Sequence, residues 1–167
     1  MAESRQALTL RLFTAMRLQR VNWGGLLLLG TQLDERGMAA ALAATGVGAA
    51  SLFVESDLAR VRLTVREGVC SFAVTTLDEA LRILKNDIRV QRPVCVVLRA
   101  DVDSTMRELA ERGVRADATV EAIGDAPAGW TMTDAAETDG DVSEINRAWL
   151  GVAGSLFPRE KTRLRWQ

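Results

Sequence analysis

The stretch Leu26-Leu-Leu-Leu-Gly30 is a continuous apolar run that ends at a glycine. Runs of this kind are typical of parallel strands buried on both faces, because such strands show no polar alternation. Two further stretches have the same character: Ser51-Leu-Phe-Val54 and Val94-Cys-Val-Val-Leu98. We expect the three stretches to be neighbouring parallel strands, with none of them at an exposed edge of the sheet.

Helical signals lie between these strands. Asp34 begins an alanine-rich segment that Gly46 and Gly48 stop, which predicts a helix over residues 34–45. Thr76, with Glu79 three residues later, forms a capping box for a helix to about residue 90. The remaining expected elements are strands over residues 49–55, 70–74 and 118–123, a helix over 57–67, where helix and strand signals compete, and a helix that Asp101 or Asp103 begins and Gly113 ends.

Amphipathic helices are expected at both ends of the chain. Over residues 4–19, Leu8, Leu12 and Met16 recur at helical spacing, with arginines on the opposite face. A second such helix is expected over residues 142–156. We expect the apolar face of one of these helices to build a homodimer.

The repeated order of strand and helix predicts a three-layer Rossmann-like α/β fold. Crossovers between parallel strands are nearly always right-handed, which places helices on both faces of a mostly parallel sheet. The 167 residues fit a single domain. Within it, residues 134–141 are interpreted as an acidic, solvated linker and residues 157–167 as a solvated basic tail.

Composition limits the classes of function. With 21 basic and 22 acidic side chains, the formal charge of −1 gives no net field to attract nucleic acid or an anionic membrane. Histidine and tyrosine are absent, which removes the usual proton shuttle and the commonest metal ligand. The longest apolar run is too short to span a bilayer, and we expect a cytoplasmic protein. Cys70 and Cys95 are expected to be reduced and not bonded to each other.

Four stretches, in this order, resemble the NAD-binding domain of urocanase, which hydrates urocanate with a tightly held NAD as electrophile. The stretches are Phe53-Val-Glu-Ser-Asp-Leu-Ala-Arg60, Thr76-Leu-Asp-Glu-Ala-Leu81, Glu108-Leu-Ala-Glu-Arg-Gly-Val-Arg-Ala-Asp117 and Pro127-Ala-Gly-Trp-Thr131. The resemblance covers residues 23–133 and implies a dinucleotide-binding fold. The rest of urocanase, including its reactive cysteine, has no counterpart in this chain.

The resemblance also implies a glycine-rich turn after the first strand, where the dinucleotide pyrophosphate meets a helix N-terminus. In this chain the turn is Thr31-Gln-Leu-Asp-Glu-Arg-Gly-Met38, and only Gly37 matches a family glycine. Asp34 and Glu35 place carboxylates near the phosphate positions, where like charges about 4 Å apart repel by roughly 4 kcal/mol. We therefore expect no bound NAD.

At the end of the second strand, Glu55 takes the position where the family holds a carboxylate for the adenosine ribose. The alternative is an exposed acid at a strand end. The vestigial cofactor site is predicted to comprise Gly30, Thr31, Gln32, Gly37, Glu55 and Asp57, with Arg99 as a further lining residue of any pocket there. The family's polar catalytic loop is shortened to residues 121–126.

These observations favour a non-catalytic domain of dinucleotide-binding descent that serves as a ligand-sensing or protein-interaction module. No catalytic residue, metal or cofactor is assigned to it. The alternative is an NAD- or nucleotide-binding component of a urocanase-related hydratase that acts with another chain. A retained dinucleotide, visible in the ultraviolet spectrum and mass of the purified protein, would discriminate between the two.

Overall fold

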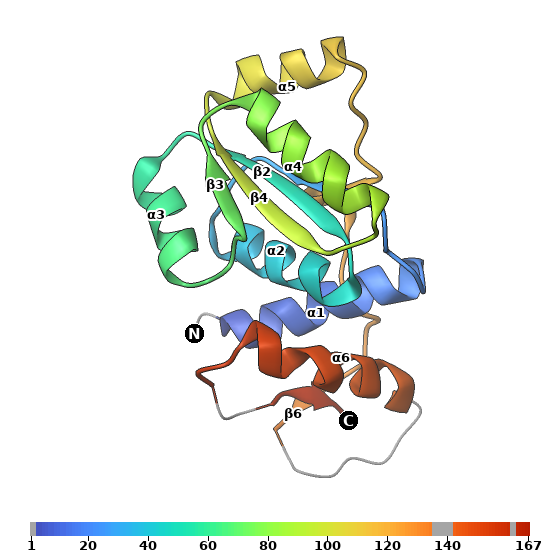
Figure 1. Ribbon diagram of the computed structural model, residues 1–167. Helices are drawn as coiled ribbons and strands as arrows, with labels where there is room; N and C mark the ends of the chain where they lie inside the picture. Colours follow the sequence, from blue (N-terminus) through green and yellow to red (C-terminus); the bar gives the residue numbers. More distant parts are fainter. Residues whose placement is uncertain (1–2, 135–141, 161–162) are drawn as a thin grey trace.

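The computed structural model describes residues 3–134, 142–160 and 163–167 (Figure 1). Its centre is a five-stranded parallel sheet in the order β3-β4-β2-β1-β5. The strands are β1 (Leu27–Gly30), β2 (Ala50–Glu55), β3 (Phe72–Val74), β4 (Val94–Arg99) and β5 (Ala118–Thr119). The helices are α1 (Arg5–Gln19), α2 (Glu35–Val47), α3 (Leu58–Arg66), α4 (Leu77–Arg89), α5 (Val102–Glu111) and α6 (Ser143–Leu156). The predicted Rossmann-like α/β fold is confirmed.

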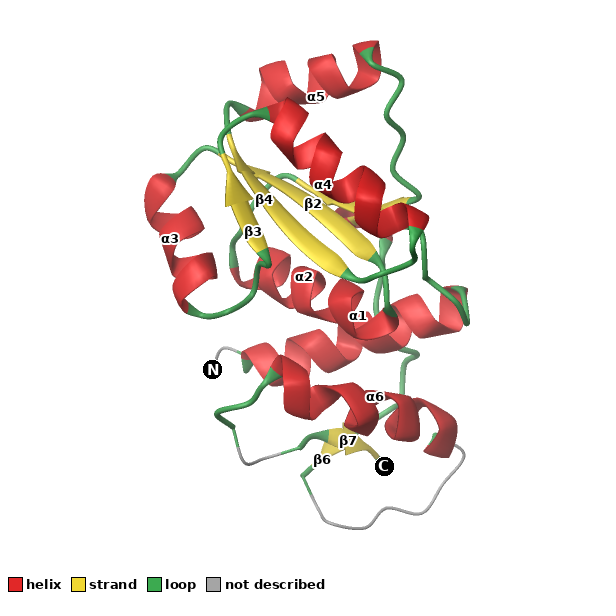
Figure 2. Ribbon diagram, viewed as in Figure 1, coloured by secondary structure: helices red, strands yellow, loops and turns green. Residues whose placement is uncertain are grey.

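The strand order explains why the helices lie on two faces. From β1 through β2 to β3 the chain moves in one direction across the sheet, and it then returns from β3 to β4 and onward to β5. With right-handed crossovers, α2 and α3 fall on one face and α4 and α5 on the other. Figure 2 shows the sheet between α4 and α2. We call the two sides the α2 face and the α4 face.

The three apolar stretches form the three central strands, as predicted. β2 pairs with β1 on one side and with β4 on the other, with Ser51 beside both Leu28 and Cys95. All six residues of β2 are buried. β3 and β5 take the edges, which is consistent with their short length and with the half-exposed Phe72 of β3.

Polar side chains begin five of the helices by accepting backbone N–H groups of the first turn. Ser4 caps α1, Asp34 caps α2, Asp57 caps α3, Thr76 caps α4 and Asp101 caps α5. Of the two glycines predicted to stop α2, Gly48 ends it in the left-handed conformation, at a φ of +93°. Gly46 does not stop it, because the helix continues through Val47.

The predicted amphipathic first helix is present, but more of it is buried than its apolar face alone. α1 lies between α2 and α6 and is buried over most of its circumference (Figure 1). Its buried polar residues have partners: Thr9 Oγ1 donates to Arg5 O, and Gln6 both donates to Glu160 and accepts from Leu164 N. The apolar faces of α1 and α6 thus pack within the chain, which removes the reason given for a homodimer.

The chain end forms part of the core, so the expected solvated tail is wrong for residues 163–167. β7 (Arg165–Trp166) pairs antiparallel with β6 (Met132–Thr133). Trp166 is fully buried, and its Nε1 donates to Thr14 Oγ1 at 2.8 Å. Asn146 exchanges two hydrogen bonds with the Trp166 backbone. Of the predicted acidic linker, residues 135–141 lie outside the described residues.

Two further expectations change in detail. The predicted strand over residues 118–123 is shorter, because Val120–Ala122 turn into a 3₁₀ helix, η1, and Ile123 is buried beneath it. Cys70 and Cys95 are not bonded to each other, as predicted, although only Cys95 is fully buried. Within the described ranges, no helix is long and apolar enough to cross a membrane.

Candidate functional site

Ligands of open α/β sheets bind outside the carboxyl ends of the strands, and the predicted site residues lie at that edge. A cavity of about 180 Å³ opens there between α2 and η1. It is lined by Thr31, Gln32, Asp34, Arg36, Gly37, Val120 and Glu121. The fold therefore brings Thr31, Gln32 and Gly37 together, whereas Gly30, Glu55, Asp57 and Arg99 are not among the lining residues.

Glu55 ends β2, but its side chain is turned into the protein. It is 3% exposed, so the alternative of an exposed acid at the strand end is wrong. Oε1 accepts the N–H of Leu33 at 3.1 Å and lies 3.4 Å from Arg60 Nη1. Oε2 accepts the N–H of Asp57 at 3.2 Å. The carboxylate thus ties the loop after β1 to the end of β2, and both of its oxygens serve the chain's own groups.

Two glycines of the site are required by close packing. A Cβ on Gly37 would lie 2.0 Å from the carbonyl oxygen of Gln32, and one on Gly30 would lie 2.3 Å from the ring of Phe53. Both distances are shorter than real carbon contacts allow. In a dinucleotide site such glycines let the cofactor approach the backbone, whereas here the space is taken by the protein itself.

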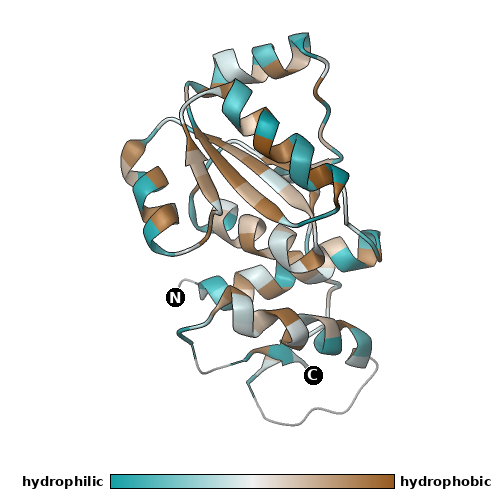
Figure 3. Cartoon of the chain, in the orientation of Figure 1, coloured by the Kyte–Doolittle hydropathy of each residue, from teal (hydrophilic) through white to brown (hydrophobic). Residues whose placement is uncertain are grey.

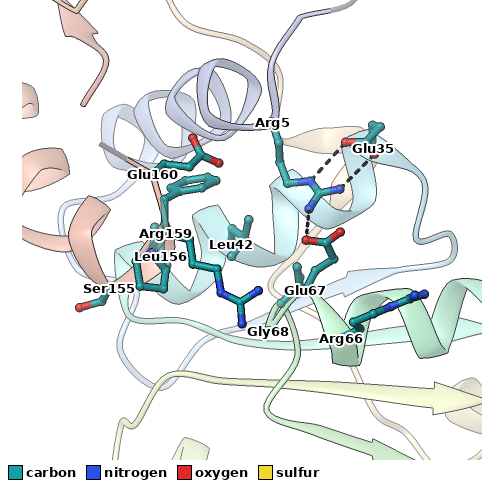
Figure 4. Close-up of a pocket in the computed structure, with 13 residues that line it drawn as sticks. Arg5, Glu35, Leu42, Arg66, Glu67, Gly68, Ser155, Leu156, Arg159 and Glu160 are labelled. Atoms are coloured by element: carbon teal, nitrogen blue, oxygen red, sulfur yellow. Dashed lines mark hydrogen bonds and ion pairs between the residues drawn. The ribbon is translucent and has the colours of Figure 1, made fainter. Parts of the chain in front are cut away.

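The two acids at the start of α2 have different roles. Asp34 Oδ1 accepts the N–H of Gly37 at 2.8 Å, so the positive end of the helix already holds a carboxylate. Glu35 points toward α1, where it accepts two hydrogen bonds from Arg5 at 3.1 and 3.2 Å (Figure 4). The sequence predicted that both carboxylates would repel a phosphate. In the structure only Asp34 does so, because Arg5 compensates the charge of Glu35.

Arg5 also borders a second cavity, of about 360 Å³, that the sequence did not reveal (Figure 4). Its walls come from α1, α2, the end of α3 with the turn after it, and the end of α6 with the segment that follows. Arg5 lies 3.7 Å from Glu67 as well as near Glu35, and Glu160 accepts a hydrogen bond from Gln6. The acids that line this cavity are thus engaged by the chain's own donors. Because its residues come from four distant segments, no local motif indicated it.

Arg99 ends β4 and stands beside Glu55 in the sheet register. The helices after β2 and β4 lie on opposite faces, so the topological switch point of the sheet falls between these two strands. Arg99 is exposed, whereas Glu55 is buried. The two residues are therefore neighbours in the sheet but differ in exposure.

The two thiols are unsuited to nucleophilic catalysis. Complete burial raises the pKa of Cys95 to about 12, and burial also raises the pKa of Cys70. A reactive cysteine requires the thiolate, which a lowered pKa favours. Neither residue has that environment.

The comparison with protein families matches residues 9–144 to the urocanase Rossmann-like domain. The match covers most of the chain and is longer than the range 23–133 expected from sequence resemblance. It includes most of α1 and reaches the start of α6. The residues after 144, which hold Trp149 and Trp166 of the core, lie outside it. The chain belongs to the urocanase family, and the part that matches is the Rossmann-like domain of that family.

Proposed function

We propose that this chain is a non-catalytic member of its family that has lost NAD binding and acts as an interaction module. The observation that carries the proposal is the inward turn of Glu55, the residue at the ribose-binding position. Both of its oxygens accept backbone N–H groups of the protein, from Leu33 and Asp57. A ribose that took over this carboxylate would leave those amides unsatisfied, which costs about 1–3 kcal/mol for each buried group.

The phosphate end of the site supports the same proposal. Asp34 occupies the amino end of α2 and accepts the Gly37 N–H that a phosphate oxygen would require. The adjoining cavity, at about 180 Å³, is smaller than the roughly 300–1,000 Å³ usual for small-molecule sites. An extended dinucleotide does not fit this volume without movement of the loop after β1.

Catalysis lacks support as well. The sequence has no histidine or tyrosine, and the pKa of both thiols is raised. The urocanase resemblance places the family's reactive cysteine outside the Rossmann-like domain, so it assigns that role to neither Cys70 nor Cys95. The scaffold therefore remains without identified groups for the hydration reaction.

Isothermal titration calorimetry with NAD tests the proposal on the full chain. We expect no binding heat from the wild type. A dissociation constant in the micromolar range or tighter overturns the proposal. If binding is found, Asp34→Gly should strengthen it, because the substitution removes the carboxylate at the helix end. Asp101→Gly, which removes the same type of cap from α5, is the matched control.

A nucleotide-binding component that acts with another chain is the second candidate. The cavity at the carboxyl end of β1 favours it, because it combines the Arg36 guanidinium with the amino end of α2. This candidate requires NAD binding that appears only when a second urocanase-like chain is added. Titration of such a mixture distinguishes the two candidates.

A further inference from the structure

A groove lies beside α4, on the face of the sheet opposite α1 and α6. It has a volume of about 810 Å³. Its walls are α4 on one side and the connection from α5 to β5 on the other, and the start of β1 closes its base. The apolar residues in its lining are Leu27, Leu81, Leu84, Ile88 and Val114. We call this feature the α4 groove.

The strand order leaves the groove open. The connection from β4 to β5 passes across β2 and β1, so one crossover has to span three strand positions. α4 runs along the sheet, α5 lies across its end, and the connection to β5 descends beside α4 (Figure 2). After β5 the chain continues to α6, which packs against α1 and α2 on the other face. The start of β1 therefore lies between α4, which buries Leu27, and the connection to β5, with the groove open between them.

The charges around the groove are unequal. Its two acids are engaged: Asp78 pairs with Arg112 at 2.6 Å, and Asp117 accepts the N–H of Leu27 at 2.8 Å. Four exposed cations also line the groove and make no hydrogen bond or ion pair with any described residue: Arg82, Lys85, Arg89 and Arg115. The groove therefore presents uncompensated positive charge above an apolar floor.

The cations and the apolar residues of α4 form two parallel stripes. Arg82, Lys85 and Arg89 have the spacing i, i+3, i+7, and Leu81, Leu84 and Ile88 repeat it one residue earlier. Seven residues of helix extend about 10 Å, so the charges are too widely spread for one small carboxylate to meet them all. An elongated partner that carries several acids and an apolar stripe matches both rows.

We propose that the α4 groove docks an acidic amphipathic helix of a partner protein. The inference rests on the proposed interaction function and names the class of partner. Apolar side chains of that helix contact Leu81 and Ile88, as in other helix-in-groove complexes, and its carboxylates face the basic stripe. Hydrophobic contact supplies most of the affinity, and charge complementarity sets the orientation and the association rate.

Amide NMR spectra of the labelled full chain, titrated with a synthetic peptide, test this proposal. The probe is a leucine–glutamate peptide about four turns long, with leucines spaced i, i+3, i+4 and i+7. Its control is a scrambled peptide of the same composition. We expect chemical-shift changes confined to α4 and residues 112–117. The scrambled peptide should bind at least about tenfold more weakly.

Arg82→Glu combined with Arg89→Glu should weaken binding at least about tenfold, because it reverses two charges of the stripe. The matched control is Arg62→Glu with Arg66→Glu, two exposed arginines of α3, which should leave binding unchanged. Single-stranded RNA and dodecanoate, titrated separately, probe the two other classes of ligand that a basic, apolar groove could take. The proposal is overturned if the peptide does not bind, if both double variants lose binding equally, or if only RNA or dodecanoate binds. A parallel NAD titration that shifts residues 31–37 would overturn the proposed function without affecting the result at α4.

Discussion

The two faces of the central sheet are covered to different depths. On the α2 face, α2 and α3 are followed by a further layer of α1 and α6, and three tryptophans are fully buried there: Trp23, Trp149 and Trp166. On the α4 face, the buried cluster is aliphatic, and in the part of the chain that the structure describes it is covered by α4 and α5. Figure 3 shows the mixture of apolar and polar positions along α4. The same sheet thus supports a thick aromatic core on one side and an open groove on the other.

This difference separates the structural part of the molecule from its candidate interaction surface. On the α2 face, polar side chains such as Gln6, Thr14 and Asn146 are buried with partners, which is the usual condition for polar groups in a core. On the α4 face, four cations of the groove make no hydrogen bond or ion pair with a described residue: Arg82, Lys85, Arg89 and Arg115. A site for a macromolecule is therefore expected on the thinner face.

The largest effect is expected in the aromatic core. Trp149→Ala should lower the free energy of unfolding by about 3–5 kcal/mol, because it removes a fully buried ring that contacts Phe13 and Phe157. Ile88→Ala in the α4 groove should cost about 1 kcal/mol, since its side chain is only half-buried. Urea unfolding measures both. Equal losses of unfolding free energy would show that the two faces contribute equally to stability, which contradicts the comparison.

Gly37→Ala should destabilise the protein by about 1–3 kcal/mol, because the new Cβ would meet the Gln32 carbonyl at 2.0 Å. Alanine is otherwise the better helix former, so the sign of the effect is informative. Gly151→Ala in α6, where nothing lies within 4 Å of the added carbon, is the control and should stabilise by up to about 1 kcal/mol. A neutral or stabilising Gly37→Ala would mean that the loop after β1 yields easily and has room for a ligand.

Glu55→Gln should destabilise by about 1–2 kcal/mol, because an amide NH₂ then faces one of the N–H donors of Leu33 and Asp57. Amide hydrogen exchange at Leu33 should accelerate in the same variant. Glu79→Gln, on the exposed side of α4, is the control and should change stability by less than about 0.5 kcal/mol. If Glu55→Gln changes neither the free energy of unfolding nor the exchange rate at Leu33, the carboxylate is available to a ligand.

The smallest effect concerns Cys95. Its pKa is raised by burial from 9.0 to about 12, so the folded state holds the proton that the unfolded state loses. The resulting stabilisation is fully present below pH 9 and is lost as the pH rises toward 12. At pH 8, iodoacetamide should label Cys95 at least a hundredfold more slowly in the native protein than in urea. Rapid native labelling would contradict its burial.

The sequence allowed the central strands and most helix starts to be predicted, because these signals are local. Continuous apolar runs identified β1, β2 and β4, and the capping box at Thr76 identified α4. The burial of α1 was missed, since its polar residues resemble a solvent face until their distant partners are known. The β6–β7 pair was missed as well, because two-residue strands more than 30 residues apart carry no periodic pattern.

The candidate site was predictable in position but not in detail. Gly37 and Glu55 lie at the edge that the dinucleotide fold indicates. The inward turn of Glu55 depends on where the Leu33 and Asp57 amides fall, which no spacing rule gives. The α4 groove was not predicted, since it results from the crossover between β4 and β5.

The central claim is that the dinucleotide site of this urocanase-family domain is closed by the protein's own groups. The ultraviolet spectrum and native mass of the full chain, purified without added cofactor, test it most directly. We predict the mass of the bare polypeptide and an absorbance accounted for by its four tryptophans and lesser chromophores. A mass increment equal to NAD, with excess absorbance at 260 nm that persists through dialysis, would contradict the account.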